Sequence, residues 1–211
     1  MDENHLIKPN HLMMKYLKYL LGLVVLIAVV FFGRGLLTPS ISYTSEITVD
    51  QPIEIAWAVA NDESKTTEWL KGLTAVEHVS GEKGTVGAVT KYTFSENGEE
   101  STIFETIKII RPNEHVAMDF VMEGVMNMDY KMDFSEKDGK THIKTSSVST
   151  GEGIFMRAML SWMGGGAKAQ EDENLGNLRE LINSNTTDYF PEPEPLVEAE
   201  AAVEAAAAGE E

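Results

Sequence analysis

The sequence predicts an α+β fold: a curved antiparallel sheet packed against a long C-terminal helix and preceded by one N-terminal transmembrane helix. Three features predict it. A single uncharged apolar run lies near the start, strand-like segments alternate with short turns through the middle, and leucines near the end are spaced for one helix face. About 170 residues follow the apolar run, which is the size of one folded domain.

The apolar run, Tyr19–Gly33, is bounded by Lys15 and Lys18 before it and by Arg34 after it. Residues 16–37 would form a helix of about 33 Å, enough to cross a hydrocarbon core of roughly 30 Å. A cleaved secretory signal would need a small-residue cleavage site, which the following GRGLLTPSIS does not offer. A buried core helix is disfavoured because the run is apolar on every face. We therefore expect a transmembrane anchor over residues 15–37.

Basic residues indicate how this anchor is oriented. Lys8, Lys15 and Lys18 precede the span and only Arg34 closely follows it. Because positively charged flanks stay in the cytoplasm, residues 1–14 are expected to form a cytoplasmic segment. The chain is therefore predicted to be a single-pass membrane protein whose folded domain lies outside the cytoplasm.

Composition limits the classes of partner and cofactor. The net charge is −17 and nothing concentrates Lys or Arg, so nucleic acid is not an expected partner. The chain has no cysteine, which excludes disulfides and Cys-ligated metals. His78, His115 and His142 lack the spacing that places two imidazoles on one metal ion. No metal and no cofactor are predicted.

The folded domain is expected over residues 41–184. Its first strand carries Ile41, Ser45 and Val49 in one phase, and Pro52 then suits the first turn of a helix. A second short helix would be capped by Asn61 or Asp62 and end at Gly72. Six further strands, separated by Gly, Asn, Asp and Pro turns, are predicted at 75–79, 86–94, 102–110, 114–123, 125–134 and 141–150.

The last predicted element is a long helix with Leu175, Leu178 and Ile182 on one face. Three glycines, Gly164–Gly166, precede it and are expected to form a hinge. Residues 188–211 carry acidic residues but no Lys or Arg, and we expect a solvated, disordered tail there. An acidic interaction tail is the alternative.

Two neighbouring strands present an apolar face rich in methionine. Alternation places Met126, Met128 and Tyr130 on one side and polar residues such as Asp129 on the other. Ordinary core packing and the lining of a cavity both fit this pattern, because methionine fills irregular spaces and adapts to apolar partners.

The order of strand, two short helices, six strands and long helix resembles the START-like or SRPBCC superfamily, which includes polyketide cyclase/dehydrase-like proteins. The segments that carry the resemblance are EITVDQPIEIAWAVANDESKTTEWLKGL, GTVGAVTKYT, IKIIRPNEHVAM and WMGGGAKAQEDENLGNLREL. The apolar segment before the domain is similar to that of membrane-anchored bacterial members.

The resemblance implies a helix-grip fold, in which the sheet wraps around the C-terminal helix and encloses a cavity for lipids or other apolar small molecules. It places the aromatic residue of the first helix at Trp57 and the tryptophan of the second at Trp69. The family has no universal catalytic set to transfer. The predicted ligand-binding residues are Trp69, Met118, Phe120, Met122, Met126, Met128, Tyr130, Met132 and Trp162.

Glu105 is the one catalytic candidate in the sequence. If Ile103, Glu105 and Ile107 point inward, burial would raise the pKa of this carboxyl group. The opposite phase of residues 102–110 is nearly as apolar and would leave Glu105 in solvent. The favoured function is a membrane-tethered module that binds or carries a lipid or other apolar molecule. A cavity enzyme of the cyclase, dehydratase or hydrolase kind that uses Glu105 is the alternative, and an interaction protein with a collapsed cavity is a third reading.

Overall fold

A computed structural model describes residues 11–191 of the chain. Four α-helices, one 3-10 helix and seven strands follow one another in these residues. Their bounds are α1 His11–Leu37, β1 Ser40–Val49, α2 Ile53–Ala60, η1 Glu63–Lys65, α3 Thr66–Trp69, β2 Leu73–Ser80, β3 Val89–Glu96, β4 Glu99–Arg111, β5 His115–Met122, β6 Met126–Lys137, β7 Lys140–Gly151 and α4 Gly153–Asn183.

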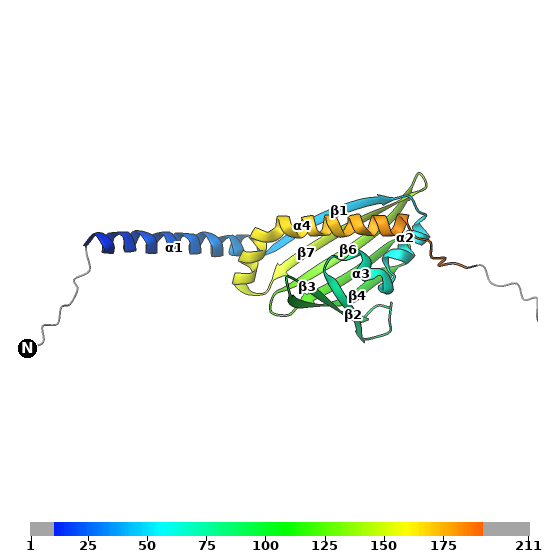
Figure 1. Cartoon of the computed structure of the whole chain (residues 1–211), viewed down its shortest axis with the longest axis horizontal. Coiled ribbons are helices and arrows are strands. Elements are labelled where there is room, and N and C mark those ends of the chain that lie inside the picture. Colours follow the sequence, from blue (N-terminus) through cyan, green and yellow to red (C-terminus); the bar gives the residue numbers. More distant parts are fainter. Residues whose placement is uncertain (1–10, 192–211) are drawn as a thin grey trace, which may run out of the picture.

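The seven strands form one antiparallel sheet in the order β1-β7-β6-β5-β4-β3-β2. Strands β2 to β7 are sequential neighbours, while β1 pairs with the last strand, β7, so that Ser40 faces Thr150 and Val49 faces Thr141. Helix α4 runs along the β1 and β7 side of the sheet, and α2 and α3 cover one end of it (Figure 1). The predicted fold class, a curved antiparallel sheet with a long C-terminal helix, is confirmed.

Two hairpin turns have the backbone conformation that their Asn-Gly and Asp-Gly sequences favour. Asn97 and Gly98 both have positive φ, as do Asp138 and Gly139. Two consecutive residues of positive φ form the turn whose twist matches that of paired strands, and Asn-Gly and Asp-Gly adopt it at little cost. These turns set the registers of β3 with β4 and of β6 with β7.

Among the predicted boundaries that differ from the structure, three have an identifiable physical reason. The second helix is broken into η1 and the short α3, with Asp62 accepting a bond from the Ser64 backbone N–H at 3.0 Å. The strand predicted from Val86 begins at Val89, because residues 81–88 form a loop in which Gly81 approaches the Ala88 backbone. The last helix was expected after Gly164–Gly166, but α4 begins at Gly153 and runs through the glycines.

The glycines therefore do not separate two elements. In Figure 1 the first, yellow part of α4 is steeply inclined to the longer remainder. We refer to residues 153–163 as the first arm of α4 and to residues 167–183 as the second arm.

Strand phases place the methionine-rich face inside, as expected. Along β6, Tyr130, Met132 and Phe134 are buried, whereas Asn127 and Asp129 are exposed. On β4 a bulge between Ile107 and Ile109 changes the phase: Glu105 is buried, and Ile110 rather than Ile109 packs against the core. This bulge explains why both phases of β4 look apolar in the sequence.

The chain remains packed beyond α4. Tyr189 lies against the core, and its hydroxyl donates to Asp62 Oδ2 at 2.8 Å. The acidic tail is predicted to be solvated from residue 188, and in the structure its first aromatic residue, Tyr189, has a partner in Asp62, the N-cap of η1. Residues 192–211 of the predicted tail and residues 1–10 of the predicted cytoplasmic segment lie outside the described residues.

Helix α1 projects from the domain as one straight element (Figure 1). Its residues Leu12–Leu37 are long and apolar enough to cross a membrane. Only its last turns contact the rest of the described chain, and they pack on the first arm of α4.

Candidate ligand-binding site

The concave face of the sheet has two ends of different character. At the end covered by α2, α3 and the second arm of α4, the interior is filled. Trp57 packs edge-on against Phe134 with ring centroids 5.0 Å apart, and Leu178 and Ile182 are fully buried. We call this the closed end.

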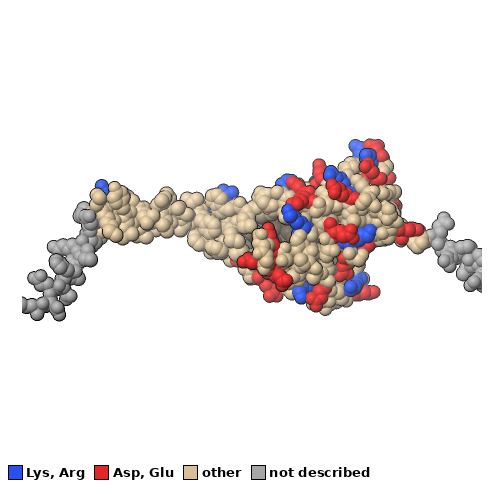
Figure 2. All heavy atoms as spheres, viewed as in Figure 1, with Lys and Arg blue, Asp and Glu red and all other residues tan. Residues whose placement is uncertain are grey.

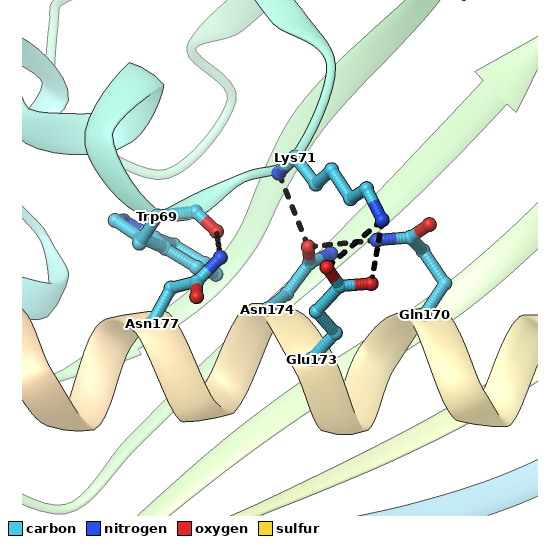
Figure 3. Close-up of polar contacts among 6 residues, drawn as sticks. All are labelled: Trp69, Lys71, Gln170, Glu173, Asn174 and Asn177. Atoms are coloured by element: carbon cyan, nitrogen blue, oxygen red, sulfur yellow. Dashed lines mark hydrogen bonds and ion pairs between the residues drawn. The ribbon is translucent and has the colours of Figure 1, made fainter.

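Polar contacts hold the closed end together (Figure 3). The Asn177 side-chain amide donates to the Trp69 carbonyl at 3.2 Å, and the Lys71 backbone N–H donates to Asn174 Oδ1 at 3.1 Å. The Lys71 ammonium pairs with Glu173 at 2.8 Å. These contacts fasten the segment after α3 to the second arm of α4, so Trp69 is fixed against the interior.

The other end of the concave face is only partly covered. Phe120 on β5 lies between Glu105 on β4 and Met128 on β6 in the same cross-strand row, and Met118 and Tyr130 occupy the next row. Phe120, Met118 and Met128 point inward and are only partly buried. We call this the open end. Figure 2 shows a shaded hollow on the illustrated face beside a group of acidic side chains.

A buried carboxyl group lies in the interior on β4. Glu105 is 7 % exposed and accepts a hydrogen bond from the Tyr92 hydroxyl on β3 at 3.1 Å. Burial raises the pKa of Glu105 from 4.5 to about 7, with the Tyr92 bond opposing the rise and the negative charge of Glu63 adding to it. Glu105 can therefore donate or accept a proton near neutral pH. Burial and the neighbouring Glu105 also raise the pKa of Tyr92, which stays a neutral donor.

A second buried carboxyl group comes from α4. Glu171 is 9 % exposed and accepts a hydrogen bond from the Tyr130 hydroxyl at 2.8 Å. The pKa of Tyr130 is raised by burial and by the Glu171 charge. Glu171 was not among the predicted site residues, although the sequence carries a signal for it. It lies four residues before Leu175 and seven before Leu178, on the apolar face of the helix.

Aromatic rings connect the two acid–tyrosine pairs. The Tyr92 and Phe120 centroids are 6.3 Å apart, and Phe120 meets Tyr130 edge-on at 5.8 Å. Glu105 and Glu171 thus lie at the two ends of a continuous row of rings along the sheet interior. The arrangement is an apolar surface with a hydrogen-bonding group at each end.

The face of β7 beneath α4 is polar but carries no charge. Thr145, Ser147 and Ser149 are all buried. Among the described residues, the Ser147 hydroxyl and the Trp69 indole Nε1 are buried without a hydrogen-bond partner. Such groups destabilise a folded protein unless something satisfies them, so the Ser147 hydroxyl, outside the filled closed end, is a candidate partner for a polar atom of a ligand.

The predicted ligand-binding residues fall into three groups. Trp69, Tyr130 and Met132 are buried in the core. Five others lie on the inner face at the open end, where Met122 and Met126 flank the β5–β6 turn: Met118, Phe120, Met122, Met126 and Met128. Trp162 lies apart from both groups, 57 % exposed beside Arg34 of α1.

His78, His115 and His142 stay separate from this site, and His115 pairs with Asp133 at 2.6 Å on the outer face. A polar groove of about 360 Å³ runs outside the sheet interior between β1, β7 and α4, where Lys168 pairs with Asp172 at 2.7 Å. Neither feature brings together the residues that the sequence predicted for the site.

Comparison with known proteins agrees with this geometry. A family described as polyketide cyclase / dehydrase and lipid transport matches residues 40–183. The chain belongs to this family. The predicted resemblance to the START-like/SRPBCC superfamily is confirmed. A search of curated proteins finds no match.

Solved structures share the fold at low sequence identity. TTHA0849 from Thermus thermophilus is 13 % identical with a TM-score of 0.59, over 70 % of this chain and 100 % of that one. Ara h 8.0201 is 18 % identical with a TM-score of 0.56, over 69 % and 99 %. The Zhui aromatase/cyclase from Streptomyces sp. R1128 is 14 % identical with a TM-score of 0.55, over 69 % and 97 %. The likeness is one of fold.

Proposed function

We propose that this family member is a membrane-anchored module that binds an apolar small molecule, such as a lipid, at the open end of its concave face. The observation that carries the proposal is the inward, partly buried group of Met118, Phe120 and Met128 between two buried carboxyl groups. Ligand sites are mostly apolar with a few convergent polar groups, and this end of the sheet has that composition.

The arrangement also suggests a ligand class. An apolar body would lie along Phe120 and the methionines, and one polar end would meet Glu105 or Glu171. Because the pKa of Glu105 is about 7, the group can donate to a carbonyl or carboxylate oxygen when protonated and accept from a hydroxyl when ionised. A fatty acid, a lipid or another amphipathic molecule with one oxygen-bearing end fits this chemistry.

The anchor supports a ligand taken from the bilayer. Residues 15–37 would cross the membrane, residues 1–14 would stay in the cytoplasm, and the domain over residues 41–184 would lie outside. Only Thr38 and Pro39 separate α1 from β1, so the domain would stay beside the bilayer at a high effective concentration of lipid. A reporter that is active only outside the cytoplasm should be active when it is fused after Asn183. A reporter that is active only in the cytoplasm should be inactive at the same position, and activity there would reverse the proposed orientation.

Native mass spectrometry of the full chain, released from gently solubilised membranes, tests the binding function. The wild type should carry an added mass of lipid size. Met128→Trp should lose it because the larger side chain fills the open end, whereas Val148→Trp on the outer face of β7 should keep it. A wild type without added mass, or equal retention in both variants, would contradict the proposal.

A second candidate function is catalysis in the same site, favoured by one observation. A buried carboxyl group with a pKa near 7 is suited to general acid–base chemistry at neutral pH. Glu105→Gln separates the two functions, because glutamine has nearly the same size and shape as glutamate but cannot act as a general acid or base. A carrier would retain a ligand of the same mass in this variant. An enzyme would instead retain unconverted substrate, and the bound mass would differ from that of the wild type.

A further inference from the structure

The end of α1 is docked on the first arm of α4. A Cβ atom on Gly35 would lie 2.6 Å from the Ala158 backbone nitrogen, so the two helix backbones approach closely there. The Arg34 guanidinium lies 4.7 Å from the centre of the Trp162 ring, and its Nε donates to the Ser161 carbonyl at 3.3 Å. The Phe31 and Phe155 rings are 5.9 Å apart.

Because the first arm is docked on α1, the position of α1 in a membrane also sets the position of the first arm. The α1 residues in contact with α4 begin no later than Phe31, inside the apolar run Tyr19–Gly33. If the membrane ended before Phe31, the apolar part from Tyr16 would be only about 22 Å long, too short for a core of roughly 30 Å. A membrane-spanning α1 must therefore carry the docked arm to the level of the bilayer.

The first arm has the surface that such a position requires. Its exposed residues include Ile154, Phe155, Trp162 and Met163, which are 44 %, 54 %, 57 % and 55 % exposed. Arg157 is the only charged residue between Gly153 and Ala167. Figure 2 shows charged side chains gathered on the half of the molecule away from α1, whereas the region next to α1 is almost free of them. Amphipathic aromatic residues such as tryptophan are favoured at the level of lipid headgroups.

We propose that the first arm of α4 lies within the outer interface of the bilayer and that Ile154, Phe155, Trp162 and Met163 contact lipid. This inference rests on the proposed membrane anchor and goes beyond it. A tether alone would leave the domain free to tumble above the membrane, whereas the docked arm sets its orientation.

That orientation places the open end beside the bilayer. The Glu152 backbone N–H, directly before the arm, donates to the Val125 carbonyl in the β5–β6 turn at 2.8 Å. Met122 and Met126 flank this turn, and Met126 faces Gly151 across the sheet. An apolar molecule that leaves the lipid beside the first arm would therefore first meet the methionines at the open end.

Site-directed spin labelling tests the position of the arm. The chain has no cysteine, so one introduced cysteine is labelled uniquely. Full-length Ile154→Cys and Met163→Cys variants would be labelled in phosphatidylcholine vesicles, and each nitroxide compared for its accessibility to oxygen and to a water-soluble nickel chelate. Val86→Cys, in the 81–88 loop and 62 % exposed, is the matched control, and Val24→Cys reports the anchor itself.

The expected result is an oxygen-to-nickel accessibility ratio several-fold higher at positions 154 and 163 than at position 86. A ratio at 154 and 163 equal to that at 86, with position 24 still in lipid, would overturn the inference and leave the anchor standing. Water accessibility at position 24 as well would overturn both.

Discussion

The two arms of α4 belong to one helix but expose opposite kinds of surface. The second arm turns Leu175, Leu178 and Ile182 toward the sheet and presents charged residues such as Glu173 outward. The first arm has few charges and presents Phe155 and Trp162 outward beside α1. The second arm has the surface of a helix that separates a protein core from water. The first arm has the surface of a helix whose outer side contacts an apolar environment. Apolar residues on a helix can therefore face either a protein core or another apolar phase. Which of the two they face depends on the elements packed around the helix.

The largest expected effect is the loss of packing in the second arm. Leu178→Ala removes a fully buried side chain and should lower the free energy of unfolding by about 2–5 kcal/mol. Phe155→Ala in the first arm should change it by less than about 1 kcal/mol in detergent micelles, because 54 % of this residue lies outside the packed protein. Urea unfolding of the full chain, followed by near-ultraviolet circular dichroism, measures both. Equal losses would contradict the division into two arms.

The next effect concerns pH at the open end. Because burial raises the pKa of Glu105 from 4.5 to about 7, the stability that its protonated form contributes is complete below pH 4.5 and is lost as the pH rises to about 7. The pKa difference corresponds to about 3 kcal/mol. Between pH 4.5 and about 7, the free energy of unfolding of the wild type should therefore fall by about 3 kcal/mol more than that of Glu105→Gln. Parallel pH profiles would show that Glu105 is ionised in the folded protein.

The junction between α1 and the first arm gives a smaller effect. Gly35→Val should separate the helices, because the new Cβ would meet the Ala158 backbone, and we expect a cost of about 1–3 kcal/mol. Gly22→Val is the matched control, since nothing lies within 4 Å of that position. Hydrogen exchange of the 153–163 amides should accelerate in Gly35→Val alone. Unchanged protection there would contradict the docked junction.

The smallest effect is expected at the glycines between the arms. Nothing lies within 4 Å of a Cβ on Gly165, and alanine is favoured over glycine in a helix by up to about 1 kcal/mol. Gly165→Ala should raise the melting temperature slightly and slow ligand release if the first arm moves during exchange. Faster release, measured by dilution of ligand-loaded protein, would argue against a hinge at this point.

Much of the fold was predictable because its signals are local. Alternation along β6 gave the inward face, and Asn-Gly and Asp-Gly gave two hairpin turns. The start of α4 was missed because Gly164–Gly166 disfavours helix locally, whereas contact with α1 and the sheet edge supports helix there. The phase of β4 remained open because a bulge makes both faces apolar in the sequence.

The candidate site was harder to predict than the fold. Glu105 was a candidate on its own strand, but its partner Tyr92 lies on β3 and is identified only by strand pairing. Glu171 reaches Tyr130 from α4, across a sequence separation that no local pattern spans. Trp162 was expected with the binding residues, yet it lies next to Arg34, because α1 occupies that side of α4.

Photo-crosslinking of the full chain in phosphatidylcholine vesicles tests the central claim most directly. The probe is a fatty acid that carries a diazirine on its acyl chain, and adducts are located by peptide mass spectrometry. The account predicts saturable labelling of the β5–β6 segment that contains Met118 and Met128, competed by unlabelled fatty acid and reduced in Met128→Trp. Labelling confined to α1 and the exposed residues of the first arm would show that lipid surrounds the protein but does not enter its concave face.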